Sequence, residues 1–282
     1  MKRVMLSVVA APLLLGSFAA SASADGIDIL SNAKVSGEIR PRYENVDDGK
    51  AGTTNANAYT ARTKLSTTAD LLGVDGLTAT VGAIAVSNFG AHGYNDGTTT
   101  YNDGTLPYST VKDPQDAMIS NAAIDYTVNN TSLHAGRGQV NLDNQRFIGT
   151  VGWRQLERSY DSLYIANNSI KNLSILVAWV YGYAGVGGTK TVDTNTVLLH
   201  AAYSVMPELK ITAYDYMIAN THDTYGIALT GNLNLSGAKL NYRAEYAAQS
   251  DATMEKGTQT ATTGKADADY YNLDLGATSM VF

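Results

Sequence analysis

The sequence predicts an all-β protein, an antiparallel transmembrane β-barrel with about 12 strands in this chain. Three observations predict it. Segments of about ten residues alternate between apolar and polar side chains. Short turns alternate with long polar loops along the chain. After the first two dozen residues, no run of about 20 apolar residues exists that could form a membrane-spanning helix.

The composition narrows the protein class. The chain has 282 residues, of which 44% are hydrophobic and 16% charged, so it is not an intrinsically disordered protein. It has no cysteine, which excludes a disulfide scaffold. It has 18 tyrosines beside four phenylalanines and two tryptophans. Tyrosine is favoured where one end of the ring meets an apolar phase and the other end meets water.

The N-terminal segment has the pattern of an export signal. Lys2 and Arg3 precede a run of apolar or small residues at 4–20, and Ala-Ser-Ala follows at 22–24. This pattern predicts a cleaved signal peptide over residues 1–24 and a barrel domain over 25–282. A membrane anchor is the alternative, but the apolar run is short and a cleavage site follows it. The mature chain would have 18 basic and 26 acidic residues, which argues against a nucleic-acid partner.

The first strands show the clearest alternation. In 34–45, Val35 and Ile39 share one face while Glu38 and Arg40 share the other. The next segment, 60–68, repeats the pattern with Arg62 and Lys64 opposite Ala61, Thr63 and Leu65. Period-two alternation is typical of strands with one apolar and one polar face. Further strands are expected at 77–87, 117–128, 132–140, 159–167, 173–184, 194–205, 209–219, 225–233, 239–249 and 268–282. The alternation blurs at 173–183 and 214–218, where both faces carry apolar or aromatic groups.

The connections distinguish a barrel from a soluble β-sandwich, which can also alternate in any single strand. Short turns are expected at 72–76, 129–131, 169–172, 206–208 and 235–237, and long polar loops at 47–57, 88–116, 185–193 and 250–267. Short periplasmic turns and long outer loops are typical of outer-membrane barrels. The charged faces would then line a water-filled interior, and the faces rich in Leu, Val, Ala and Tyr would contact lipid.

The sequence contains no recognisable catalytic or metal-binding motif. His92, His134, His200 and His222 are scattered without the spacing of metal ligands. The repeated Tyr-Asn-Asp-Gly at 94–97 and 101–104 lacks the order of a calcium loop and is interpreted as turn sequence. We therefore expect no enzymatic activity, cofactor or metal.

The most specific segment is GRGQVNLDNQRFIG at 136–149, followed by GWRQ at 152–155 and Tyr160-Asp161. It resembles the signature of the alginate-export-like family of bacterial outer-membrane porins. The segment SGEIRPRYE at 36–44 is similar to that family's first strand. One departure is Gly138, where the family usually has glutamine. The resemblance implies a passive channel of many strands in the outer membrane of a Gram-negative bacterium, with arginines lining the pore, and it does not specify the solute.

The charged residues of this segment suit a constriction. The candidate lining residues are Arg40, Arg42, Arg62, Lys64, Arg137, Asp143, Arg146, Arg154 and Arg158. A guanidinium is always charged, and a ring of fixed cations favours the entry of anions. The alternative is that these arginines pair with Asp143, Glu157 and Asp161 and hold the loop against the wall. Both interpretations stay open, because pairing and selectivity can coexist.

The expected function is therefore an outer-membrane porin, a diffusion channel for small polar solutes with a preference for anions. Its expected partners are outer-membrane lipid and small anionic solutes, and association into a homo-oligomer is left open. The alternative is a non-conducting barrel that serves as a surface adhesin or structural protein. Phe282 is out of phase with Tyr271, Leu273 and Leu275, whereas bacterial barrels commonly end in an aromatic residue in phase with the outward face. This predicts a truncated or frame-disrupted end and an unpaired edge strand.

Overall fold

The computed structural model describes residues 23–24, 27–90, 93–97, 108–235, 238–255 and 266–279. Residues 1–22 of the predicted signal peptide, the second Tyr-Asn-Asp-Gly repeat and Phe282 lie outside these ranges. The described residues contain no helix that is long and apolar enough to cross a membrane.

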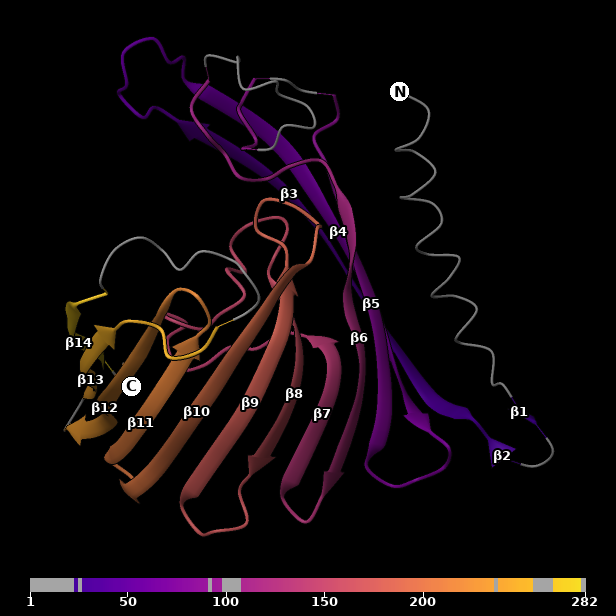
Figure 1. The fold of residues 1–282 in the computed structure, drawn as a ribbon, viewed down its shortest axis with the longest axis vertical. Coiled ribbons are helices and arrows are strands. Elements are labelled where there is room, and N and C mark those ends of the chain that lie inside the picture. The colour runs from indigo at the N-terminus through magenta and orange to yellow at the C-terminus, as the bar shows by residue number, and fades with distance from the viewer. Residues whose placement is uncertain are drawn as a thin grey trace. The chain divides into compact units, whose positions relative to one another are not determined.

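Twelve strands form one sheet in which each strand neighbours the next along the chain (Figure 1). They are β3 (Leu30–Val46), β4 (Ala56–Leu71), β5 (Leu77–Ser87), β6 (Ala117–Val128), β7 (Thr131–Gly138), β8 (Ser159–Asn167), β9 (Leu173–Ala184), β10 (Val192–Met206), β11 (Leu209–Ile218), β12 (His222–Leu235), β13 (Ala238–Ser250) and β14 (Ala268–Ser279). The all-β antiparallel fold and all twelve predicted strands are confirmed. The short strands β1 (Ser23–Ala24) and β2 (Ile27–Asp28) pair in a separate sheet.

The ends of the sheet order are β3 and β14, each with one neighbour among the described strands. Both strands carry large apolar side chains that are exposed. Ile39 of β3 is 77% exposed, and Leu273 and Leu275 of β14 are exposed as well. An edge strand of this kind presents unpaired backbone groups. The prediction of an unpaired edge at the first or last strand is confirmed for the described residues.

The chain divides into two compact units. The first comprises Met1–Tyr126, Ala135–Asp161 and Tyr183–Val192, and the second comprises Thr127–His134, Ser162–Gly182 and Asp193–Phe282. In the first unit, Arg40 lies opposite Arg62 and Glu38 lies opposite Lys64 in the β3–β4 register. Since side chains two residues apart share a face, these four charged residues lie on one face of the sheet. That confirms the predicted charged face within this unit.

The same face of the first unit also holds an apolar cluster. Ile84 lies opposite Lys64, and Val86 lies opposite Arg62. Both are buried in a cluster with Met118, Leu156 and Ala184. Leu156 belongs to the connection between β7 and β8, so this cluster packs that connection against the charged face.

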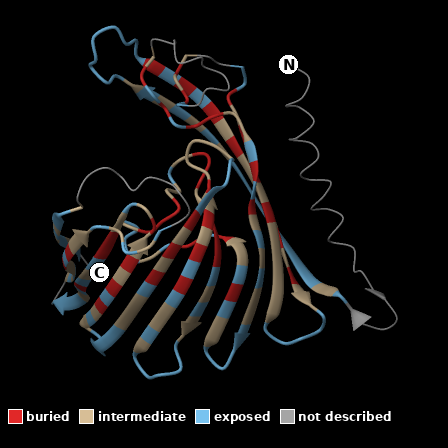
Figure 2. Ribbon diagram, viewed as in Figure 1, coloured by how far each residue is buried: buried red, intermediate tan, exposed pale blue. Residues whose placement is uncertain are grey.

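In the second unit, burial alternates along the strands (Figure 2). Thr212, Tyr214 and Tyr216 of β11 are buried on one face. The rings of Tyr214 and Tyr216 stack with their centres 4.7 Å apart. The Tyr214 hydroxyl donates a hydrogen bond of 2.8 Å to Glu245, which places Glu245 of β13 on the same face.

Candidate functional site

The connection over residues 139–158, which we call the β7–β8 loop, lies against β3 in the first unit. Arg40 donates from Nη1 to the Gly152 carbonyl at 2.9 Å and from Nε to Gln155 Oε1 at 3.2 Å. Its Nη2 donates to the carbonyl of Arg154. Carbonyl groups in irregular backbone need partners, and the fixed fork of a guanidinium supplies several at once. Arg40 therefore holds the turn at 152–155 to the strand.

Arg42 of β3 and Arg154 of the turn itself share two partners, Glu44 and Trp153. Arg42 Nη2 lies 2.5 Å from Glu44 Oε2, and Arg154 Nη1 lies 3.2 Å from the same oxygen. The guanidinium carbon of Arg154 lies 4.0 Å from the centre of the Trp153 ring, and that of Arg42 lies 5.3 Å away. Cations over an aromatic face are attracted by its quadrupole. Glu44 and Trp153 thus hold two like charges close together.

Asp113 is a second carboxylate that binds this turn, through the Gln155 backbone and the same two arginines. Its side chain is fully buried, and Oδ1 accepts a hydrogen bond of 2.8 Å from the Gln155 backbone N–H. Oδ2 lies 3.6 Å from Arg42 Nη1 and 3.7 Å from Arg154 Nη1. The Tyr94 hydroxyl donates to the Asp113 carbonyl at 2.8 Å. Burial raises the pKa of Tyr94 to about 12, so it remains a neutral donor at ordinary pH.

Glu157 is the most connected carboxylate of the loop. Its Oε2 lies 3.4 Å from Arg62 Nη1, and its Oε1 accepts from Lys64 Nζ and Gln139 Nε2. Arg62 is 4% exposed and also binds Glu38 through both carboxylate oxygens, at 2.6 and 2.9 Å. A buried charge is tolerated only when it is paired. This network therefore braces the loop against β3 and β4.

Both ends of the loop are fixed by residues of the signature segment. Arg137 forms a bidentate pair with Asp161, with both N···O distances at 2.7 Å, and also binds Thr191 at 2.9 Å.

The connection after β9 also contacts the loop closely. Gly185 allows this packing, because a Cβ there would lie 2.2 Å from the Glu157 carbonyl oxygen and its φ is +103°. The Val186 N–H donates to the Leu156 carbonyl at 2.9 Å.

The structure places the predicted lining residues at four positions. Arg40, Arg42, Arg62, Lys64 and Arg154 meet in the network under the loop. Arg137 lies at the end of the loop with Asp161, and Arg158 lies with its guanidinium carbon 4.8 Å from the Tyr183 ring centre. Asp143 and Arg146 are exposed on the loop itself. Arg62 is 4% exposed, because Glu38 and Glu157 enclose it.

Sequence reasoning did not name Glu44, Asp113, Trp153 or Gln155 as lining residues, although Trp153 and Gln155 belong to the signature segment. Glu44 belonged to the alternating charged face and could have been included on that basis. Asp113 lies in a long polar loop where nothing in the sequence distinguishes it from its acidic neighbours. Among the described residues, no group of three or more histidine or carboxylate side chains is placed to hold a metal ion.

Comparison with solved structures identifies the fold. The chain is similar to Pseudomonas aeruginosa OccD3 (OpdP), with a TM-score of 0.64 and 17% identity over 89% of this chain and 56% of that one. It is similar to Acinetobacter baumannii OccAB3, with a TM-score of 0.68 and 13% identity over 88% of this chain and 64% of that one. It is also similar to Pseudomonas aeruginosa OpdK with vanillate, with a TM-score of 0.68 and 10% identity over 88% of this chain and 64% of that one.

These neighbours are outer-membrane porins, so the chain has the fold of an outer-membrane porin wall. It spans 56% to 64% of the length of these three structures. No family model matches the chain, and no curated protein matches it.

Proposed function

We propose that this protein is an outer-membrane porin, a passive diffusion channel for small polar solutes in which the β7–β8 loop narrows the path. The observation that carries the proposal is the loop itself. It is bound to the charged face of β3 and β4 by Arg40, Arg62 and Lys64, on a sheet with the porin fold. A loop bound to the polar face of a sheet can restrict a channel that this face lines. Export by the signal peptide over residues 1–24 and location in the outer membrane belong to the same proposal.

The preference for anions rests on the local charge balance. The cations of the site are Arg40, Arg42, Arg62, Lys64, Arg137, Arg146, Arg154 and Arg158, and its carboxylates are Glu38, Glu44, Asp113, Asp143, Glu157 and Asp161. The named residues carry an excess of two positive charges, although the whole chain has a formal net charge of −6. Low-dielectric walls focus such a field.

Exposure separates two roles within this set. The Arg40 and Lys64 side chains are 30% and 22% exposed, so they pair with the loop and still act on solutes. Arg62 acts as a brace only. Arg146 is exposed on the surface of the loop, so its guanidinium can act on solutes directly.

We further propose that the chain belongs to the alginate-export-like family. The signature residues support this, because they contact one another or the loop they enclose. Arg137 pairs with Asp161, Gln139 binds Glu157, and Gln155 Oε1 accepts a hydrogen bond of 3.2 Å from Arg40 Nε. The resemblance therefore lies in residues that build the constriction.

The test is the zero-current potential of the protein in planar bilayers under a potassium chloride gradient. We expect a modest anion preference that fades as salt shortens the screening length. Arg146→Gln should shift the potential toward cations at low salt. Lys50→Gln removes the same charge from an exposed position in the loop after β3 and should shift it less.

Each failure has a distinct meaning. Insertion without conductance would support the non-conducting barrel and overturn the porin. A conducting but cation-selective protein, or an Arg146→Gln variant with an unchanged potential, would overturn the anion preference alone.

A further inference from the structure

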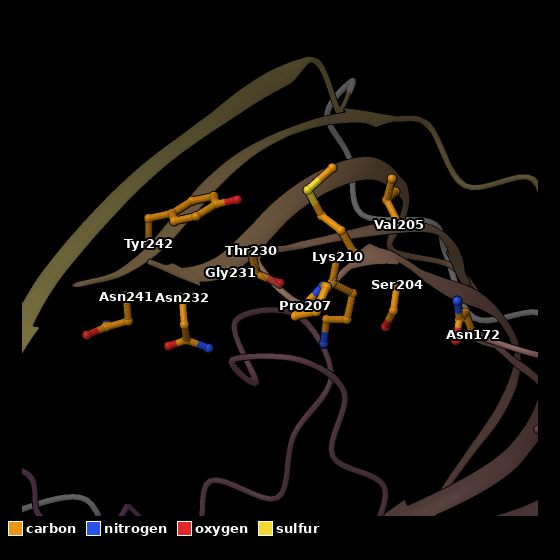
Figure 3. Close-up of a pocket in the computed structure, with 11 residues that line it drawn as sticks. Asn172, Ser204, Val205, Pro207, Lys210, Thr230, Gly231, Asn232, Asn241 and Tyr242 are labelled. Carbon is orange, nitrogen blue, oxygen red and sulfur yellow. The ribbon is translucent and has the colours of Figure 1, made fainter. Parts of the chain in front are cut away.

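A cavity of about 810 Å³ lies in the second unit, away from the β7–β8 loop in sequence. It is bounded by the ends of β10 to β13 that are joined by short turns (Figure 3). In outer-membrane barrels the short turns face the periplasm. None of the residues described above as part of the constriction lines this cavity.

The polar side chains of the cavity converge because of strand register. Lys210 of β11 lies opposite Thr230 of β12, and Asn232 of β12 lies opposite Asn241 of β13. Lys210 also lies opposite Ser204 of β10. Figure 3 shows the Lys210 amine and the amide ends of Asn232 and Asn241 on one side of the ribbon, and the Tyr242 ring on the other. Lys210, Asn232 and Asn241 are exposed and can contact a solute.

The lining of the cavity has one cationic group and several polar groups but no carboxylate among the described residues. It comprises one ammonium group, the amides of Asn172, Asn232 and Asn241, and the hydroxyls of Ser204 and Thr230, while the Tyr242 hydroxyl is bonded to the Glu208 carbonyl. No carboxylate lines the cavity within the described residues. An ammonium group and amide N–H groups are donors that suit an oxyanion, and no negative charge on the lining opposes one. The nearest guanidinium in the register, Arg243, lies opposite Thr230 and binds Glu245 at 2.8 Å.

The wall of the cavity is fixed by close packing at the turn. The Tyr242 hydroxyl donates to the Glu208 carbonyl at 2.7 Å, and a Cβ at Gly231 would lie 1.8 Å from that carbonyl oxygen. Only glycine therefore permits this approach of the turn to β12. The Ser204 N–H donates to the Asn172 carbonyl at 2.9 Å, which ties the neighbouring turn to β10. A preformed wall lowers the entropic cost of binding.

We propose that this cavity is a binding site for small oxyanions, with Lys210 as its charged group and Asn232 and Asn241 as its amide donors. It is a second site, separate from the constriction. In a channel, weak binding at more than one site allows a solute to leave as the next one enters.

The test is titration of the detergent-solubilised protein with inorganic phosphate and with acetate, followed by the side-chain NH₂ resonances of Asn232 and Asn241. We expect saturable shifts with both anions. Lys210→Gln should weaken binding and raise the apparent dissociation constant about tenfold. That is the scale of one charge-assisted hydrogen bond. Lys171→Gln removes a charge from the β8–β9 turn without changing the lining and should leave the constant within about twofold of the wild-type value.

Three results would overturn the site: shifts that do not saturate, unchanged binding in Lys210→Gln, or equal loss in Lys171→Gln. Circular dichroism of each variant checks that strand content is retained. Because the titration needs no conduction, a protein that fails as a porin can still show this site. A working channel without the shifts would refute the site alone.

Discussion

The polar face of the first unit and the polar face of the second differ in what covers them. In the first unit, the β7–β8 loop lies over the strands, and Arg62 and Glu157 are 4% and 5% exposed. In the second unit, the same face is buried near Tyr214 and Glu245, but at its turn end Lys210 and Asn241 line an open cavity. The same period-two pattern produces both faces. Under the loop, Arg62 is therefore paired and buried, whereas Lys210 at the uncovered turn end of the second unit is exposed.

The largest expected effect is on the covered face. Glu157→Ala would leave Arg62 and Lys64 without a shared partner, and losing one member of a buried ion pair costs about 3–5 kcal/mol. We expect a loss of this size in the free energy of unfolding of the loop. Fluorescence of Trp153 in urea, in a Trp179→Phe background, measures it.

Asp75→Asn is the matched control, because Asp75 lies exposed in the turn after β4 of the same unit. It should change the free energy of unfolding by less than about 0.5 kcal/mol. If Glu157→Ala behaved like this control, the loop would not depend on its brace.

A smaller effect is expected where the loop meets the connection after β9. Gly185→Ala combines a positive φ of +103° with a Cβ placed 2.2 Å from the Glu157 carbonyl oxygen. Gly187→Ala also has a positive φ, +130°, but nothing lies within 4 Å of its Cβ. Backbone strain alone costs about 1–3 kcal/mol. Gly185→Ala should therefore cost more than Gly187→Ala.

The two glycine variants should also differ in where they act. Gly185→Ala should speed hydrogen exchange at the Val186 amide, which donates to Leu156. Gly187→Ala should leave that amide protected. Equal costs and equal protection would show that the close contact at Gly185 does not hold the loop.

The strands were predictable because the pattern that defines them is local. The bounds of β5, β6, β8 and β9 coincide with those predicted from alternation and turn residues. β3 and β4 extend further than predicted, from Leu30 and to Leu71, because backbone pairing continues past the residues that alternate most clearly. The shared face of Arg40, Arg62 and Lys64 also followed from parity along the strand.

The coverage of that face was not predictable, because it depends on contacts between distant parts of the chain. Arg62 and Glu157 are separated by 95 residues, and Arg42 and Trp153 by 111. Ile84 and Val86 are apolar residues on the charged face, and only the packing of Leu156 against them explains why. The sequence left pairing and selectivity as alternatives for the arginines. The structure shows extensive pairing, while selectivity remains a prediction.

The central claim is that the β7–β8 loop lies in the path of ions, and chemical modification of a single cysteine tests it most directly. The natural chain has no cysteine, so each variant has one reactive site. Trp153→Cys places it on the exposed surface of the loop, and Ile39→Cys places it on the opposite face of β3. During single-channel recording, a bulky thiol reagent should reduce the current through Trp153→Cys and leave Ile39→Cys unchanged. An unchanged current through a fully modified Trp153→Cys channel would contradict the account.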